Sequence, residues 1–388
     1  MLDNGDAAVL TLLDQSAAFD TVDHGILLSR LSALFGLSGT VLSWFESYLT
    51  GRLQCICISG VCSAAVLLLF GVPQGSVLGP VLFTLYNSPI HSILKRRGIT
   101  DHLYSDDIQL YTNFTLDPDY IDQKRAFSSI TACVGETKQW MTDNLIKFNE
   151  SSRCKPAALP LIVGESSILP SDSVRNLCVI LDKHLTMQQQ IGSICRTSFY
   201  QLRRIAKIRK FLSRPAAAQL VSAFVLSHID YGNSLLAGLP AMRLYPLQKA
   251  QNAAARVITG ARRRDPMTAH LRDLHWLPIS YRIDFKIAVL TFRCLNGCAP
   301  SYLSSLLSRQ RMANPSGRVL RSSVVPSAHL DLVPPSVRVK THGLRAFANR
   351  APVVWNKLPV GIRAMSTLSS FRKALKTHLF RVAFNICV

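Results

Sequence analysis

HLYSDDIQLYT, residues 102–112, is the most informative stretch of the chain for its architecture. It predicts two short strands around a tight turn that carries Asp106 and Asp107. Upstream of it, the apolar run AAVLTLL (7–13) ends at Asp14, and its length and the flanking acid suit a buried strand. Carboxylates therefore gather at strand ends, where their side chains can point out of the edge of a sheet.

Asp14, Asp106 and Asp107 are the residue type that a hard cation needs. Mg²⁺ takes a few protein carboxylates and fills its other positions with water or substrate phosphates. Two such ions close together can activate an attacking hydroxyl and stabilise a leaving pyrophosphate. Singly, an Asp-Asp turn or a strand-terminal Asp is usually a solvated turn or a cap. Together, in one order, they predict a two-metal nucleotidyl transferase.

The rest of the chain alternates between strand-like and helical patterns. Helices are predicted over 22–34, 40–50, 81–94 and 127–148, and strands over 53–59, 64–70, 160–163 and 177–181. From about residue 190 helices are predicted over 191–212, 215–228, 247–259, 281–296 and 367–383, with Ser280 as an N-cap and Gly260 and Gly297 as C-terminal caps. Residues 310–340, rich in Ser, Pro and Val, predict a loop or linker.

A membrane-spanning alternative arises because no charged residue occurs between Arg52 and Lys95. Glycine, serine and proline interrupt this span, and its longest apolar run, 64–70, is too short to cross a bilayer. We interpret 64–70 as a buried strand instead. No membrane partner is expected.

The net charge of +21 is unevenly distributed. Residues 1–150 hold 9 basic and 15 acidic residues, whereas residues 151–388 hold 35 basic and 8 acidic ones. A solvated polar face normally mixes both signs, so the basic excess predicts contact with nucleic-acid phosphates. The predicted nucleic-acid-binding residues share one basic helix; they are Arg203, Arg204, Lys207, Arg209 and Lys210.

The ten cysteines show no pair of zinc knuckles and no Cys/His set with zinc-ligand spacing. Most lie in apolar stretches, where a free cysteine acts as a small hydrophobic residue. No secretory signal is recognised at Met1, so we expect a reducing, intracellular compartment, either nucleus or cytoplasm.

The chain resembles the reverse transcriptases of non-LTR (LINE-type) retrotransposons. Three segments are similar to the successive motifs of that family's palm: LLDQSAAFDTVDH (12–24), GVPQGSVLGPVLFTLY (71–86) and YSDDIQLY (104–111). NLCVILDKHLT (176–186) resembles the primer-grip hairpin, with Cys178 where the family usually has Gly. The similarity continues through FVLSHIDYGNSLLAGLP (224–240), LQKAQNAAARVITG (247–260), VWNKLP (354–359) and LSSFRKALKTHLF (368–380).

The resemblance implies a role for each matching residue. Asp14 and Asp106 would be the principal ligands of two Mg²⁺ ions, for which Mn²⁺ is a substitute, and Asp107 would be the third acid. Phe19 would be a steric gate against a ribose 2′-hydroxyl, or else a packing residue. The nucleotide-binding set would also include Gln74 and Gly75, beside the incoming nucleotide and the template base, and Tyr104, which would support the primer end.

Two departures from the family pattern stand out. Only thirteen residues precede Asp14, so the finger segment and the upstream endonuclease are expected to be missing. The family's Asn followed closely by Lys-Thr-Glu is replaced by Asn149-Glu150-Ser151-Ser152-Arg153-Cys154-Lys155. The basic residue that would act near the pyrophosphate is therefore displaced or lost. Arg153 and Lys155 are nearby basic residues but do not match its position in the motif.

The predicted fold class is α+β: a reverse-transcriptase palm with an antiparallel sheet and flanking helices, then an α-helical thumb-like region and a basic tail. The expected domains are a palm over 1–168, a primer-grip-like hairpin over 169–190, a thumb-like region over 191–309, and a linker with a basic C-terminal region over 310–388. The expected function is an RNA-directed DNA polymerase core that takes deoxynucleoside triphosphates, an RNA template and a DNA primer. The alternatives are a catalytically inactive retrotransposon-derived fragment that only binds nucleic acid and, less favoured, a two-metal nuclease.

Overall fold

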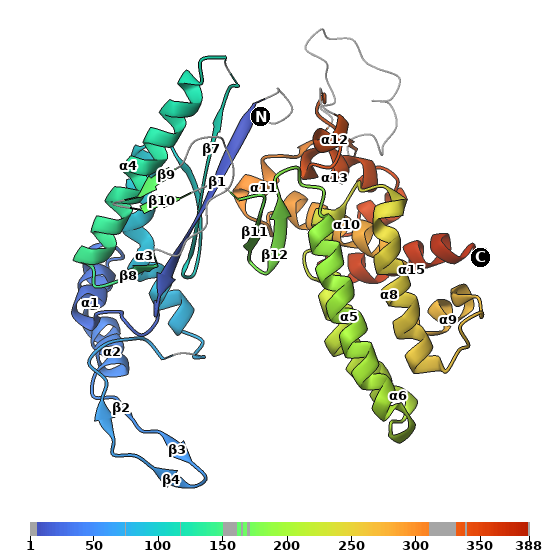
Figure 1. Cartoon of the computed structure of the whole chain (residues 1–388), viewed down its shortest axis with the longest axis horizontal. Coiled ribbons are helices and arrows are strands. Elements are labelled where there is room, and N and C mark those ends of the chain that lie inside the picture. Colours follow the sequence, from blue (N-terminus) through green and yellow to red (C-terminus); the bar gives the residue numbers. More distant parts are fainter. Residues whose placement is uncertain are drawn as a thin grey trace. The chain divides into compact units, whose positions relative to one another are not determined.

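The computed structural model of the chain describes residues 6–73, 75–116, 118–149, 161–163, 166–168, 171–309, 331–337 and 340–386. It is mixed α+β, mostly helical with small antiparallel sheets, as Figure 1 shows. The chain divides into two compact units, unit 1 over Gly5–Cys178 and unit 2 over Val179–Val388. The division falls inside the range 169–190 that the sequence predicts to be one hairpin.

Unit 1 is organised by a four-stranded antiparallel sheet with the strand order β6-β7-β1-β8. Its strands are β1 (Ala7–Ser16), β6 (Thr100–Tyr104), β7 (Asp107–Phe114) and β8 (Lys147–Asn149). The register pairs Leu13 with Ile108 between β1 and β7. It also pairs Asp14 with Asn149 between β1 and β8. β1 is therefore an inner strand, as its apolar run predicts.

One face of this sheet is buried and the other is not. Val9 and Leu13 of β1, and Ile108 and Leu110 of β7, are almost fully buried. They share a core with side chains of α3 (Gly79–Arg96) and α4 (Ile121–Asp143), which cover that face (Figure 1). Because side chains alternate along a strand, the residues between them lie on the opposite, more exposed face.

Helices α1 (His24–Ala33) and α2 (Gly39–Leu49) complete this part of unit 1, with α1 packed on α3, and one arginine links three helices. The guanidinium of Arg30 lies 4.5 Å from the ring centroid of Tyr86 on α3 and 5.0 Å from that of Trp140 on α4. It also donates hydrogen bonds to the Tyr86 carbonyl and to Oδ1 of Asn144. Burial lowers the pKa of Arg30, and the two rings and two oxygens compensate its charge.

The interpretation of 64–70 as a buried strand is wrong. Only Val66–Leu67 form a strand, β5, which pairs with β2 (Leu53–Gln54) in an arm completed by β3 (Cys57–Ile58) and β4 (Val61–Cys62). This arm extends from the lower end of unit 1 in Figure 1. Val66 and Leu69 are 65% and 63% exposed, because no other element of the described chain covers the arm.

The cysteines also differ in part from expectation. Cys133 and Cys294 are buried, as small hydrophobic residues should be. On the arm, however, Cys57 and Cys62 face each other across the β3–β4 pair and form a disulfide, with Cys55 exposed nearby. Their apolar neighbours in the sequence belong to the same uncovered arm, so these cysteines gain no burial from them.

Unit 2 packs helices around one hydrophobic core. The longer helices are α5 (Gln188–Ile208), α6 (Arg214–Val221), α8 (Ala241–Thr259), α10 (Ile279–Leu295), α13 (Phe347–Trp355) and α15 (Leu368–Phe384). Shorter ones are α7 (Ser227–Asp230), α9 (Met267–Asp273), α11 (Ser301–Ser304), α12 (Lys340–Gly343) and α14 (Val360–Arg363). Trp355 and Phe371 are almost fully buried in this core, where the Phe371 ring also stacks on Phe292 at 4.4 Å.

The remaining strands are short. They are β9 (Leu161–Val163), β10 (Ser166–Ile168), β11 (Ser173–Asn176), β12 (Val179–Asp182), β13 (Ser308–Arg309) and β14 (Leu332–Val333). Asp182 connects β12 to α5: its carboxylate accepts from the backbone N–H of Thr186 and Met187, each at 2.8 Å. Burial alone would raise the pKa of Asp182, but these donors outweigh burial and lower it.

Several predicted boundaries need correction. The helix predicted over 127–148 ends at Asp143, and the chain then enters β8, beside Asp14. Ser280 lies inside α10, whose N-cap is Pro278. Gly260 caps α8 with a positive φ of 73°, as predicted. Most of the linker range 310–340 lies outside the described residues, and no described helix is long and apolar enough to span a membrane.

Candidate active site

The exposed face of the β1–β7 sheet brings the predicted carboxylates together. Leu13 pairs with Ile108 on the buried face, so Asp14 and Asp107, one step further along, lie on the other face. Tyr104 pairs with Asp107 across the β6–β7 turn, which places its side chain on that same face. Asp106 occupies the turn itself, between Ser105 and Asp107.

Electrostatics indicate that the three carboxylates are neighbours. The pKa of Asp107 is raised first by burial and then by the negative charges of Asp106 and Asp14. Like charges at short range favour the protonated form, so the three carboxylates repel one another when ionised. Their carboxylate oxygens are more widely spaced than the sulfur atoms of Cys55, Cys57 and Cys62. Those three sulfur atoms, in the described part of the chain, all lie within 4.8 Å of one another.

The turn that carries Asp106 is conformationally strained. Ser105 has a φ of 56°, in the left-handed region that non-glycine residues seldom adopt. The backbone of the two strands continues to pair up to Tyr104 and Asp107, so the loop holds only Ser105 and Asp106. A two-residue loop fixes the direction of Asp106 relative to Asp107 more tightly than a long loop would.

The second predicted motif is tied to the first by backbone contacts. The N–H of Gly71 donates to the carbonyl of Val22, and the N–H of Val72 donates to the carbonyl of Phe19, each at 2.8 Å. His24 adds a side-chain hydrogen bond to the Gly71 carbonyl at 2.8 Å. A Cβ on Gly71 would lie only 3.1 Å from the Phe19 carbonyl, so this approach requires glycine.

The surroundings of Phe19 bear on its two sequence-based interpretations, a steric gate and a packing residue. Its ring is half-buried and tilts against the buried ring of Phe83 on α3, with centroids 4.9 Å apart. The contact stabilises the segment that follows Asp14, which is a packing role. Part of the side chain stays exposed.

The 71–80 loop ends in an ordered turn. Gln74 lies outside the described residues, whereas Gly75 is exposed with a φ of 79°, and a Cβ added there would meet no heavy atom within 4 Å. Ser76 Oγ donates to the Pro73 carbonyl at 2.7 Å and accepts from the Gly79 N–H at 2.9 Å. This turn leads directly into α3 and leaves the backbone at Gly75 approachable.

The sequence pattern misses one basic residue at this face. Lys147 is exposed and pairs with Ser16 across β1–β8, so its side chain shares the face of Asp14, which lies two residues before Ser16. The prediction of a helix to residue 148 concealed this position. Arg153 and Lys155, the substitutes considered from composition, lie outside the described residues.

In unit 2, the basic residues predicted to bind nucleic acid fall into two groups, exposed side chains and the half-buried Arg209. Arg203, Arg204 and Lys207 are exposed on α5, and Lys210 is exposed just beyond it. Exposed rings lie among them: Arg204 stands 5.8 Å from the Tyr200 ring and Lys210 4.9 Å from the Phe211 ring. We call the exposed residues Tyr200, Arg203, Arg204, Lys207, Lys210 and Phe211 the α5 surface.

Arg209 does not belong to that surface. Its guanidinium donates to the carbonyls of Val257 and Ile258 at the end of α8, at 2.8 and 3.0 Å, and to Leu212 at 2.7 Å. Carbonyls in the last turn of a helix lack partners within it, so this arginine completes the end of α8. Its neighbours in the sequence give no sign of this role, because Arg209 and Val257 are 48 residues apart.

Comparison with known proteins agrees with the arrangement of the motifs. The family model "Reverse transcriptase (RNA-dependent DNA polymerase)" matches residues 1–154. The RNA-directed DNA polymerase from mobile element jockey of Drosophila funebris is 24% identical over 330 residues, which are 80% of this chain and 34% of that protein. The probable RNA-directed DNA polymerase from transposon BS of Drosophila melanogaster is 25% identical over 265 residues, which are 64% of this chain and 28% of that protein.

One solved structure is similar at a level too low to establish a shared fold. It is the telomerase of Candida albicans in complex with a TWJ fragment of telomeric RNA, with a TM-score of 0.33 and 12% identity over 72% of this chain and 48% of that one. The similarity to reverse transcriptases therefore rests on the family match and the polymerase relatives. The chain spans about a third of the length of those relatives. Residues 1–154 match the reverse transcriptase family, and the chain is distantly similar to the polymerases of non-LTR retrotransposons.

Proposed function

We propose that the chain is the core of an RNA-directed DNA polymerase, in which the aspartates of unit 1 carry the chemistry and unit 2 binds nucleic acid. The observation that supports this most is the shared sheet face of Asp14 and Asp107, with Asp106 close enough to raise the pKa of Asp107. The reaction would be attack of a primer 3′-hydroxyl on the α-phosphate of a deoxynucleoside triphosphate, with pyrophosphate leaving.

The donor set suits the magnesium that reverse transcriptases typically use. Asp107 lies beside two further carboxylates that raise its pKa, and hard cations prefer carboxylate oxygens. Asp14, Asp106 and Asp107 would hold the ions. Bound Mg²⁺ would polarise the phosphate and lower the pKa of the attacking hydroxyl.

The proposal gives each of the other candidate residues a role. Tyr104 is 65% exposed on the Asp107 side and offers a ring on which the primer end can rest. Lys147, on the Asp14 side, would neutralise charge on the triphosphate. Gly75 would leave room for the incoming nucleotide, and Phe19 would limit the space near its sugar.

Lys147→Ala should raise the KM for the deoxynucleotide about tenfold, whereas Lys124→Ala, on α4, should leave this KM unchanged.

A second candidate function is nucleic-acid binding without catalysis. It is favoured by the α5 surface, whose cations and aromatic rings need nothing from unit 1 to bind phosphates and bases. This candidate predicts salt-sensitive binding and no Mg²⁺-dependent incorporation.

Primer extension on an RNA template separates the two candidates. The polymerase proposal expects Mg²⁺-dependent extension by the intact chain and its loss in the double variant Asp106→Asn/Asp107→Asn. Binding of the template–primer by that variant, measured in parallel, should be retained. Extension that is equal in both chains, or absent from both while binding persists, would leave binding alone as the function.

A further inference from the structure

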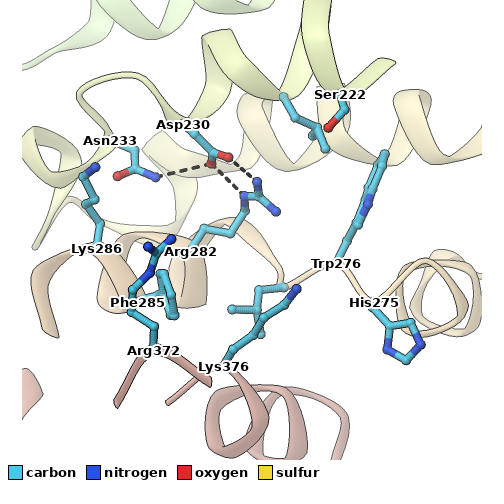
Figure 2. Close-up of a pocket in the computed structure, with 12 residues that line it drawn as sticks. Ser222, Asp230, Asn233, His275, Trp276, Arg282, Phe285, Lys286, Arg372 and Lys376 are labelled. Atoms are coloured by element: carbon cyan, nitrogen blue, oxygen red, sulfur yellow. Dashed lines mark hydrogen bonds and ion pairs between the residues drawn. The ribbon is translucent and has the colours of Figure 1, made fainter. Parts of the chain in front are cut away.

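Unit 2 contains a pocket that neither the motifs nor the comparisons assign. Its volume is about 430 Å³, within the roughly 300–1,000 Å³ range of ligand sites. It lies among α7, α10, α15 and the segment between α9 and α10 (Figure 2). Four cationic side chains and one carboxylate line it: Arg282, Lys286, Arg372, Lys376 and Asp230.

The charges of the pocket are not balanced. Asp230 is satisfied by Arg282, which donates to it through two nitrogens, one of them at 2.7 Å. Lys286, Arg372 and Lys376 are exposed and form no ion pair within the described part of the chain. Arg372 and Lys376 are four residues apart on α15 and so share one helix face. An anion at this mouth would meet three unpaired cations.

The pocket wall also offers an aromatic ring. Trp276 is half-buried beside the hydrophobic core, and Figure 2 shows its indole standing on the Lys376 side, opposite Lys286 and Arg372. An indole beside cations is the combination that binds the phosphates and bases of single strands. Neither an isolated phosphate nor a paired base would use both features.

Two further features mark this place in the fold. Residues Ser222–Leu226 form a single π-helical turn, and both Ser222 and Leu226 line the pocket. Such turns are frequent at functional sites because they displace side chains from the regular helical register. Asn233, 5% exposed, donates to Asp230 at 3.4 Å, yet its Oδ1 accepts no hydrogen bond within the described residues. A buried acceptor without a donor is an incomplete site.

We propose that this pocket holds one unpaired nucleotide of a single-stranded nucleic acid, with its base on Trp276 and its flanking phosphates on Lys286, Arg372 and Lys376. The inference rests on the proposed function only in taking nucleic acid as the ligand. It adds a site for an unpaired end or tail, distinct in its residues from the α5 surface. The volume suits one nucleotide, and the aromatic wall requires an unstacked base.

The test is fluorescence anisotropy of labelled single-stranded RNA and DNA oligonucleotides bound to the full chain, without Mg²⁺ or deoxynucleotides. Arg372→Ala/Lys376→Ala should weaken binding roughly tenfold and reduce the slope of log affinity against log salt by about 1.4, since each phosphate contact on a single strand contributes about 0.7. The control Lys373→Ala/Arg381→Ala removes the same charge from the same helix. Lys373 and Arg381 line a different pocket. This control should change neither quantity appreciably.

The base contact has its own readout. Trp276→Ala should weaken binding of a normal oligonucleotide about tenfold but not that of an abasic one of equal length, and Trp276→Phe should restore most of the affinity. Thermal melting of each variant separates loss of folding from loss of binding. RNA and DNA arms distinguish the two ligands, and millimolar inorganic phosphate tests whether phosphate alone occupies the pocket.

The outcomes separate this inference from the proposed function. If the pocket variants weaken single-strand binding more than their controls, the pocket is assigned. If they match their controls while Arg203→Ala/Arg204→Ala/Lys207→Ala weakens binding, the pocket inference is wrong and the α5 surface stands. If the intact chain binds no nucleic acid at moderate salt, the binding part of the proposed function fails as well. Displacement by free phosphate with no Trp276 effect would also overturn the assignment.

Discussion

The two units use opposite charges on different scaffolds. In unit 1, register between β1 and β7 fixes Asp14 beside Asp107, so the carboxylates converge to within mutual influence. In unit 2, exposed cations are distributed over several helices, among them α5, α10 and α15. A cation site needs a few oxygens held in a fixed geometry, which a sheet supplies. Binding to a phosphate backbone needs charge density, which exposed helices supply without fixed pairs.

The largest effect should come from variants that separate the two proposed activities, polymerisation by unit 1 and nucleic-acid binding by unit 2. Asp14→Asn removes one proposed metal ligand from the sheet and should lower primer extension at least about 100-fold, while template–primer affinity changes less than about twofold. Arg203→Ala/Arg204→Ala/Lys207→Ala should do the reverse, reducing the salt slope of duplex binding by about 2 to 3. Extension at saturating template–primer should then be retained. If either variant loses both activities in equal measure, the division between units is not functional.

The next effect concerns the half-buried arginine that links the helices of unit 1. Arg30→Ala should destabilise unit 1 by about 2–4 kcal/mol, because it removes two ring contacts and leaves the Tyr86 carbonyl and Asn144 without their donor. Urea denaturation measures the loss. Arg52→Ala, an exposed arginine 5.6 Å from the Tyr48 ring, is the control and should cost less than about 0.5 kcal/mol. Equal costs would contradict the central role of Arg30.

A smaller effect is the pH dependence of the acidic site. The pKa of Asp107 is raised in the folded chain, so its contribution to the free energy of unfolding is most favourable below its unfolded pKa. This contribution is lost as the pH rises through the folded pKa of Asp107, where its carboxylate becomes charged beside Asp106 and Asp14. Asp107→Asn should therefore make the chain more stable at neutral pH, in buffer without divalent metal, and flatten this part of the pH profile. The charged α5 surface should show no such change when Lys207→Gln is measured alongside.

The smallest effect is at the turn next to the boundary between the units. Cys178 has a φ of 62°, where glycine is favoured. Cys178→Gly should relieve this strain and stabilise the chain by about 0.5–1 kcal/mol in urea denaturation. Cys298→Gly, at another exposed cysteine whose φ is not positive, should give no gain. A loss of stability at position 178 would show that the turn is not strained.

Much of the site could be predicted because each of its residues lies in an element that short-range sequence patterns predict. The turn with Asp106 and Asp107, the strand that ends near Asp14 and most helices of unit 2 follow from short-range patterns. The reverse transcriptase family match, over residues 1–154, includes this turn and this strand. Patterns of this kind describe which face a residue takes within its own element, and that was enough to bring the aspartates to one sheet face.

What the sequence did not reveal depends on distant contacts. β8 continues the chain after α4 and becomes a strand by pairing with β1, so Lys147 reaches the site through a partner far away in the sequence. Segment 64–70 is apolar yet exposed, because burial requires a covering element that a pattern cannot guarantee. Arg209 has the sequence pattern of a surface cation but completes the end of α8.

The central claim is that three aspartates of unit 1 share a cation site, and binding of Mn²⁺ tests it without requiring catalysis. Electron paramagnetic resonance of Mn²⁺ titrated into the full chain should show bound ions that Mg²⁺ displaces. Asp14→Asn, Asp106→Asn and Asp107→Asn should each weaken this binding about tenfold or more, while Asp143→Asn, at the end of α4, should not. Equal Mn²⁺ binding by the intact chain and all three site variants would contradict the account.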